Sequence, residues 1–345
     1  MDAPREPNPN VLRRASIGTS RSGKPMPPEQ PELSVVIVTG DPGTRRGLEK
    51  TLSSLIHQQS VEKIEIVVLD CASAGAPPLS GSDHPCVRTV KLPRAGTTMA
   101  QARAEGVRQA RAPIVGFLDE HSFAMAGWAE ALINAHRGPW AGVGGEIYNG
   151  TSARGFSDPI YLMGHSPWMP PAPRGEAELL PSHDTCYKRE VILKYGDQLP
   201  ELLMAEPVLM RRLRLDGHRL FVDPDVKSTH GYTVSPLTLV AFYAWSRCFA
   251  ASRARVFGWS LAKRLLFGLS SPLIPLVRAA RLFLFLLRRR PACLPTFLVG
   301  LPIILLAQAG AALGEGLGMV FGLGAAEVLF TQTHLRGLRL RAEYP

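Results

Sequence analysis

Three aspartates follow apolar runs that are typical of buried strands. Asp41, Asp70 and Asp119 stand at or just after the ends of these runs, which are Leu33–Thr39, Ile64–Leu69 and Pro113–Leu118. The carboxyl ends of parallel strands meet at one edge of a sheet, where α/β proteins bind their ligands. One aspartate there can equally be a turn or cap residue, but a buried sheet has no structural need for three. We therefore expect a polar site at this edge.

The last of these turns carries residue types that bind metal ions. Asp119-Glu120-His121 presents carboxylates and an imidazole in one turn, and His230 ends a later strand-like segment. Such ligands suit Mg²⁺ or Mn²⁺ bridging a diphosphate. The alternative is a solvated acidic turn, because lone histidines are more often hydrogen-bonded than metal-bound. Asp119, His121 and His230 are the candidate metal ligands.

The elements around these residues alternate between strand and helix. A further strand is expected at Val87–Leu92, and apolar residues at helical spacing predict helices at Arg46–Gln58 and Thr98–Ala110. This alternation indicates an α/β fold with a mostly parallel, twisted sheet flanked by helices. Later segments are less regular: strands are expected at 143–148, 220–222 and 226–229, a loop at 161–173 and a helix at 206–215.

The net charge of +10 is confined to the last third of the 345 residues. Up to Ser235 there are 26 Lys plus Arg and 26 Asp plus Glu, whereas from Pro236 onward there are 13 and three. Basic side chains beside long apolar runs suit an anionic membrane surface. DNA binding would need aromatic or base-reading elements beside the charge, and the sequence has none.

Two kinds of apolar segment make up this basic region. Leu237–Phe267 and Leu273–Leu287 mix apolar and basic residues at helical spacing, which is typical of amphipathic helices at a membrane interface. Ala292–Gly314 has 23 residues without a charge, enough to cross about 30 Å of hydrocarbon. Arg288–Arg290 would mark its cytoplasmic end. Prolines within this segment leave open a re-entrant hairpin with Gly316–Phe330 as its return limb.

These patterns divide the chain into three parts. We expect a disordered tail rich in Pro, Ser and Arg at residues 1–31, an α/β domain at 32–235 and a helical membrane-associated region at 236–345. The tail lacks the apolar segment of a signal peptide. Five scattered cysteines without a C-x-x-C pair favour a reducing compartment. The expected location is the cytoplasmic face of the cell membrane.

Motif-like segments follow one another in order between residue 34 and about residue 230. They are Ser34–Asp41, Val68–Ser73, Gly96–Gly106, Phe117–His121, Ser182–Gly196, Ala205–Arg212 and His230. In this order they resemble the motifs of family 2 glycosyltransferases with the A-type fold. Phe117–His121 is similar to f-L-D-x-D with His121 at the second aspartate, and Ala205–Arg212 is similar to E-D-x-x-L-x-x-R with Glu206 at the aspartate. The resemblance implies a GT-A, Rossmann-like domain that binds a nucleotide sugar.

The resemblance also implies roles for single residues. Thr39, Asp41, Asp70, Arg103 and Asp119 would bind the nucleotide sugar, with Asp119 near the metal or ribose. Asp70 can accept a hydrogen bond from a base N–H, and this discriminates because an unmatched buried acceptor costs roughly 1 to 3 kcal/mol. Arg103 can pair with a phosphate or carboxylate in a fork, or be a solvent-facing helix charge.

Glu206 is the candidate general base. Sugar transfer needs a carboxylate to accept the proton of the acceptor hydroxyl and a cation to stabilise the leaving diphosphate. Glu206 and Asp119 are therefore the expected catalytic residues. Glu206 precedes Pro207 at a helix start, so it can also stabilise that helix. The acceptor-site candidates are Trp168, His183, Asp184 and Arg212.

The expected protein is a glycosyltransferase of polysaccharide biosynthesis. It would move a sugar from a nucleotide-sugar donor to a lipid-linked or saccharide acceptor by metal-assisted inverting displacement, with no nucleic-acid partner. The departures at Cys71, His121 and Glu206 motivate an alternative, a catalytically inert nucleotide-sugar-binding membrane scaffold. A nucleotidyltransferase would need a glycine-rich, basic phosphate loop after its first strand, which the sequence lacks.

Overall fold

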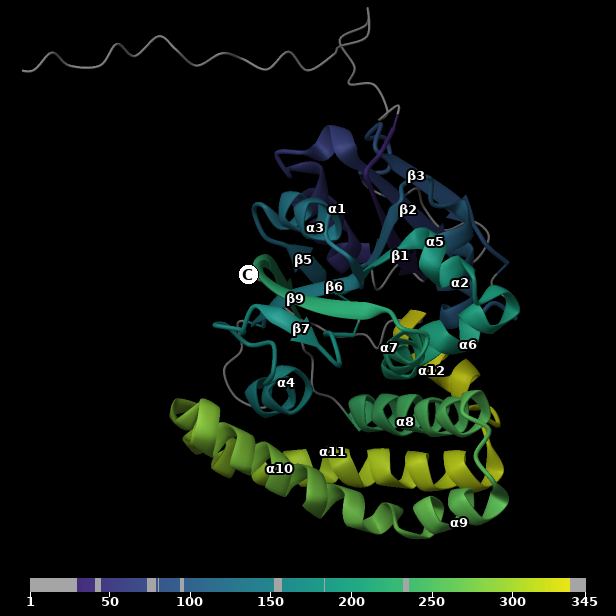
Figure 1. Ribbon diagram of the computed structural model, residues 1–345, viewed down its shortest axis with the longest axis vertical. Helices are drawn as coiled ribbons and strands as arrows, with labels where there is room; N and C mark the ends of the chain where they lie inside the picture. The colour runs from purple at the N-terminus through teal and green to yellow at the C-terminus, as the bar shows by residue number, and fades with distance from the viewer. Residues whose placement is uncertain are drawn as a thin grey trace, which may run out of the picture.

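The computed structural model describes residues 30–335 apart from 41–44, 73–78, 80, 94–95, 152–156, 183 and 232–235. Asp41, His183 and the tail up to residue 29 lie outside the described residues, so their expected roles stay predictions. The described chain forms an α/β layer above a stack of helices (Figure 1).

Within the described residues, nine strands form one sheet in the order β3-β2-β1-β4-β8-β6-β9-β5, with β7 paired to β9. The strands are β1 (Leu33–Thr39), β2 (Ile64–Asp70), β3 (Val87–Lys91), β4 (Ile114–Phe117), β5 (Ser122–Ala124), β6 (Trp140–Asn149), β7 (Gly175–Ala177), β8 (Cys186–Lys188) and β9 (Arg219–His230). The block from β3 to β4 is parallel. Beyond it the sheet is mixed, because β8 runs antiparallel to both β4 and β6. The expected α/β fold is confirmed, with parallel pairing concentrated in its first half.

Helices cover both faces of the sheet. They are α1 (Arg45–Ile56), α2 (Met99–Gln109), α3 (Trp128–His136), α4 (Ser157–His165), α5 (Arg189–Leu193), α6 (Leu199–Met204) and α7 (Glu206–Leu215). Successive side chains of a strand point to opposite faces, so Val35 and Ile37 pack in the core beneath α1 and α3 while Val36 and Val38 pack beneath α2 and α6. Burial on both faces explains the unbroken apolar runs of the central strands.

The start of α2 is defined by local sequence. Thr98 caps the helix by accepting from the Gln101 N–H, and the Gln101 side chain accepts from the Thr98 N–H in return. Gly106 lets the helix approach β1 closely, since a Cβ there would lie 2.4 Å from a methyl group of Val36. These features place the early turns of α2, which carry Arg103, above the carboxyl end of the parallel strands.

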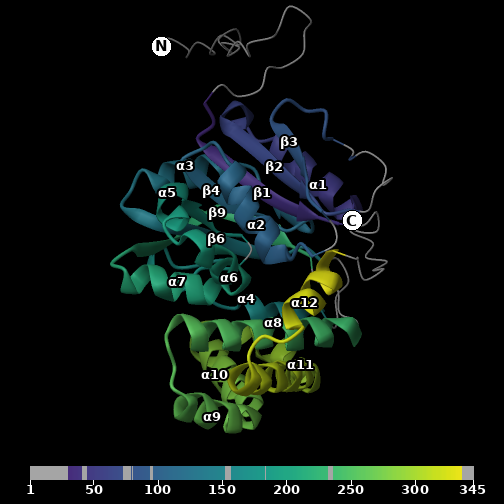
Figure 2. The same cartoon turned by 90° about the vertical axis from the view of Figure 1, so that its right-hand side faces the viewer.

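The remaining helices are stacked below the sheet (Figure 1). They are α8 (Pro236–Val256), α9 (Leu261–Leu269), α10 (Ile274–Arg289), α11 (Leu294–Phe321) and α12 (Ala326–Leu335). α8 contacts α6 and α7, α11 packs along α8, and α9 and α10 lie outermost. α12 climbs back toward α2 (Figure 2), where the Met99 N–H donates to Thr331 Oγ1 at 3.0 Å.

Two expectations about these elements are wrong, and one open alternative is not seen. The segment expected as one helix at 237–267 is two helices, because the chain turns at Gly258 with a φ of 58°. The loop expected at 161–173 begins inside α4. Of the two alternatives left open for the apolar segment, the described residues do not form the hairpin with Gly316–Phe330 as its return limb, because α11 continues through Pro302 to Phe321. Its glycines serve close packing instead: a Cβ at Gly314 would lie 2.2 Å from the Tyr243 carbonyl oxygen of α8.

Candidate active site

The ends of β1, β2 and β4 share one edge of the sheet. Thr39 closes β1 and pairs in register with Asp70, which closes β2. Thr39 Oγ1 donates to Glu120 Oε2 at 3.1 Å, so the turn after β4 reaches back to β1. Asp70 is buried and accepts from Lys91 Nζ at 2.6 Å and from the Ala72 N–H at 2.9 Å. The predicted polar edge is therefore present, with the Asp70 carboxylate already held by a neighbouring strand.

Arg103 joins the two predicted catalytic acids. Its Nη2 donates to Asp119 Oδ1 at 2.8 Å and its Nη1 to Glu206 Oε1 at 3.2 Å. Arg103 comes from α2, Asp119 from the turn after β4 and Glu206 from the first turn of α7, and all three are buried. A planar guanidinium can bridge two carboxylates because its N–H groups form a rigid fork. Three residues far apart in sequence thus form one charged cluster.

The three candidate metal ligands also converge. The ligand atoms of Asp119, His121 and His230 lie within 4.8 Å of one another. His230 Nδ1 lies 2.8 Å from Ser122 Oγ and 3.8 Å from Asp184 Oδ2, and partners of this kind orient a ligating imidazole. One carboxylate with two imidazoles is a donor set that divalent transition metals accept. The residues present therefore fit a cation at this position.

The protonation states agree with this fit. Burial lowers the pKa of His121, with Asp119 opposing the effect and Arg103 reinforcing it. Burial likewise lowers the pKa of His165, whose ring stacks on His230 at 5.6 Å between centroids, to about 4. A lowered pKa favours the neutral imidazole of His121, and neutral imidazole is the form that binds a metal.

Asp184, an acceptor-site candidate, lies at the metal side of the cluster. It is 1% exposed, and its Oδ2 lies 3.8 Å from His230 Nδ1. Burial raises its pKa well above the ordinary value, and the nearby Asp119 and Glu206 carboxylates add to the effect. Its contact with His230 fits a residue that orients a ligand better than one that meets an acceptor.

The other described acceptor candidates lie farther out. The Trp168 ring is 6.3 Å from the His165 ring, and its carbonyl accepts from the Ile147 N–H at 3.0 Å. Arg212 is half-exposed on α7, where its Nε pairs with Asp216 Oδ2 at 3.0 Å. The structure therefore links Trp168 to the cluster through His165 but gives Arg212 only the contact of a surface helix charge.

Two histidines near the site escaped the sequence-based prediction. His165 ends α4, in a segment expected to be a loop. His334 lies on α12; burial lowers its pKa to about 4, and Asp119, His121 and Arg103 are close enough to perturb that pKa electrostatically. His334 lies more than 200 residues after Asp119 and comes near it only through tertiary folding. No local motif marks His334, and only its histidine type could have suggested it.

The fold and this cluster define a class, the GT-A-like α/β domains whose ligands bind at the carboxyl edge of the sheet. Residues 34–191, somewhat less than half of the chain, match the family model for Glycosyl transferase family 2, so this part of the chain is similar to that family. The match includes Arg103, Asp119 and Asp184, while Glu206 and His230 lie beyond it. No curated protein matches the chain.

Solved glycosyltransferases have related folds at low sequence identity. The chain is similar to S. aureus TarS (20% identity, TM-score 0.46, 64% of this chain and 39% of that chain) and to GalNAc-T7 (16%, 0.44, 59% and 43%). It thus spans well under two thirds of either protein. The mannosyltransferase PcManGT from Pyrobaculum calidifontis, in complex with GDP-Man and Mn²⁺, matches over 86% of this chain and 90% of its own (16%, TM-score 0.50).

Proposed function

We propose that this protein transfers a glycosyl group from a nucleoside-diphosphate sugar to an acceptor hydroxyl by a single, inverting displacement. The observation that carries the proposal is the buried cluster of Arg103, Asp119 and Glu206 beside the ligand atoms of His121 and His230. Such a transfer needs a carboxylate base next to a cation-binding group.

The residues of this chain have distinct tasks in that reaction. Glu206 accepts the proton of the acceptor hydroxyl while the hydroxyl oxygen forms a bond to the anomeric carbon. The bond between the anomeric carbon and the diphosphate oxygen breaks at the same time, and its electron pair stays on the diphosphate. Arg103 keeps Glu206 and Asp119 in fixed positions through its fork. Thr39 and Asp70 bind the nucleoside at the strand edge. A bound divalent cation supplies charge neutralisation for the leaving diphosphate.

The donor set favours Mn²⁺ over Mg²⁺. Two of the three ligand atoms are imidazole nitrogens, whereas Mg²⁺ prefers oxygen ligands. The similar mannosyltransferase is a complex with GDP-Man and Mn²⁺, which supports these two ligand classes here.

We further propose that the transfer takes place at the cytoplasmic face of the membrane, on a lipid-linked or saccharide acceptor of polysaccharide biosynthesis. Two helical segments, Leu261–Arg289 and Pro291–Phe321, are long and apolar enough to cross a bilayer by length and composition. Together with the basic excess of this region, they support membrane association. The proposed division at 235/236 separates the sheet from these segments.

Donor turnover by the full-length protein tests the proposed reaction. Release of UDP or GDP from nucleotide sugars with Mn²⁺ should fall by at least about a hundredfold in Glu206→Gln, which loses the basic carboxylate but keeps an oxygen for Arg103. Nucleotide affinity should change little. Glu105 is a half-buried acid on α2 that pairs with Arg108, and it makes no contact with Glu206 or Asp119 that the structure records. Glu105→Gln is therefore the matched control and should behave as the wild type.

Two outcomes would redirect this proposal. Undiminished turnover in Glu206→Gln would contradict its role as base. Tight nucleotide-sugar binding by the wild type without any turnover would favour the inert scaffold instead.

A further inference from the structure

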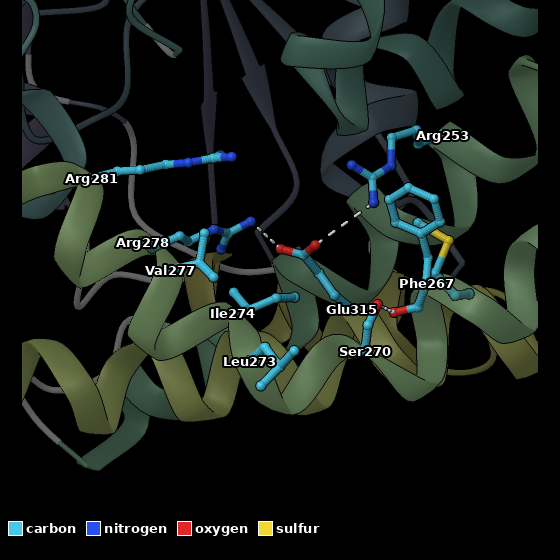
Figure 3. Close-up of a pocket in the computed structure, with 10 residues that line it drawn as sticks. Arg253, Phe267, Ser270, Leu273, Ile274, Val277, Arg278, Arg281 and Glu315 are labelled. Carbon is cyan, nitrogen blue, oxygen red and sulfur yellow. Dashed lines mark hydrogen bonds and ion pairs between the residues drawn. The ribbon is translucent and has the colours of Figure 1, made fainter.

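A pocket of about 330 Å³ lies in the helical stack (Figure 3), and its lining includes no residue of the proposed active site. α8, α9, α10 and α11 contribute its lining. Its apolar walls include Phe267, Ile274 and Met319, and its polar groups are three arginines and one glutamate. This volume is at the lower end for small-molecule sites, so it can hold a headgroup-sized ligand.

Positive charge in this pocket exceeds negative charge. Glu315 is buried and pairs with Arg278, and its other oxygen lies 3.8 Å from Arg253. Figure 3 shows these two arginines reaching Glu315 from either side, while Arg281 does not turn toward it. Among the described residues Arg281 has no hydrogen bond or ion pair, and Arg253 Nε is buried without a hydrogen-bond partner. Buried donors and unbalanced cations favour an anionic ligand.

The rim of the pocket continues into an apolar surface. Leu273 and Val277 line the pocket and are 58% and 44% exposed, and Leu269 and Leu276 beside them are exposed as well. An anionic group attached to a hydrocarbon chain would match both parts, the charge inside and the chain along this surface.

The packing of α11 indicates how the apolar surface of α9 and α10 would be oriented relative to a membrane. α11 lies along α8, which is packed on α6 and α7 of the sheet domain, and α9 and α10 form the outermost layer (Figure 1). Close glycine contacts with α8 hold α11 in place. A helix fixed beside the sheet domain suits an orientation in the membrane plane, with the apolar side chains of α9 and α10 entering the interface.

We propose that this pocket binds the phosphate headgroup of an anionic membrane phospholipid, whose acyl chains lie along the exposed apolar side chains of α9 and α10. Arg281 and Arg253 would donate to the phosphate, and Glu315 would hold Arg278 and Arg253 in position. This site is independent of the proposed glycosyl transfer.

Vesicle binding by the full-length protein tests the proposal. The probes are vesicles of phosphatidylcholine alone and vesicles in which part of it is replaced by phosphatidylglycerol. Arg281→Gln is compared with Arg288→Gln, because each removes one exposed charge from α10 but only Arg281 lines the pocket. We expect the wild type to bind the anionic vesicles more tightly than the phosphatidylcholine vesicles. The ratio of these two affinities should fall about tenfold further in Arg281→Gln than in Arg288→Gln, as the loss of a charge-assisted hydrogen bond predicts.

Equal losses in the two variants would show attraction to surface charge alone and would overturn the proposal, as would equal wild-type binding to both kinds of vesicle. Inorganic phosphate at matched ionic strength separates the lipid from a free anion. If phosphate displaces the anionic vesicles, or protects the wild type but not Arg281→Gln against heat, the pocket is a site for a free anion and the lipid assignment fails.

Discussion

Asp119 takes part in two sets of contacts at the residue scale. One of its oxygens accepts from Arg103, and it also supplies a ligand atom to the group with His121 and His230. Charge-assisted contacts of this kind fix a carboxylate more firmly than neutral hydrogen bonds do. We therefore infer that cation binding at the histidines and the position of Glu206, the other partner of Arg103, depend on each other.

His121 gives this site a specific prediction about metal preference. His121→Asp would replace one imidazole ligand by a second carboxylate. The larger proportion of oxygen ligands would then suit Mg²⁺ better. Heat stabilisation by nucleotide with Mn²⁺ or Mg²⁺ measures the preference through binding to the native state. We expect clear selectivity for Mn²⁺ in the wild type and reduced selectivity in His121→Asp. His57→Asp, at an exposed histidine just after α1, serves as the control. An unchanged ion preference in His121→Asp would argue against His121 as a ligand.

At the scale of elements, a buried acid joins β1 and β2 to the segment that follows α2. Glu65 of β2 accepts from Ser34 Oγ at 2.7 Å and from the N–H and Nε of Arg111 at 2.9 and 2.8 Å. Burial raises the pKa of Glu65, but the hydrogen bonds from Ser34 and Arg111 outweigh it and hold the pKa below the ordinary 4.5. The folded state thus favours the carboxylate.

This network predicts how stability depends on pH. A lowered folded-state pKa contributes stability above the unfolded value of about 4.5, and this contribution is lost as pH falls through the folded pKa. Glu65→Gln should lower the free energy of unfolding by about 1 to 3 kcal/mol near neutral pH and should lose less than the wild type upon acidification. Urea unfolding at about pH 7 and about pH 3.5 measures both effects. If Glu65→Gln loses as much unfolding free energy upon acidification as the wild type, this role of Glu65 is refuted. Glu49→Gln, at an exposed glutamate, shows the change that removal of a surface carboxylate causes.

Elements whose pattern is local could be predicted from the sequence, and elements that depend on distant partners could not. β1, β2 and α7 lie where the apolar runs and the Glu206–Leu215 pattern put them. β8 has three residues between β4 and β6, too few to show any periodicity. Arg103 and Glu206 could be named as site candidates because each stands in a recognisable segment. His334 could not, because it comes near Asp119 only when α12, more than 200 residues later in the chain, packs back against the sheet domain.

At the scale of the whole molecule, the chain passes from the sheet into the helical stack and returns. α8 packs on α6 and α7, while α12 docks on α2 through Thr331 (Figure 2). The proposed membrane surface of α9 and α10 and the proposed active site are therefore joined by α11 and α12. This arrangement would hold the donor site at a fixed height above the bilayer, where a membrane-bound acceptor can reach it.

Calorimetric titration of UDP and GDP in the presence of Mn²⁺ tests the central claim most directly, in the wild type, in Asp119→Asn and in the control Glu105→Gln. If Asp119 joins the cation and the Arg103 fork in one nucleotide site, Asp119→Asn should weaken Mn²⁺-dependent binding of the preferred nucleotide by at least about tenfold, with Glu105→Gln unchanged. Equal affinities in all three proteins would contradict the account.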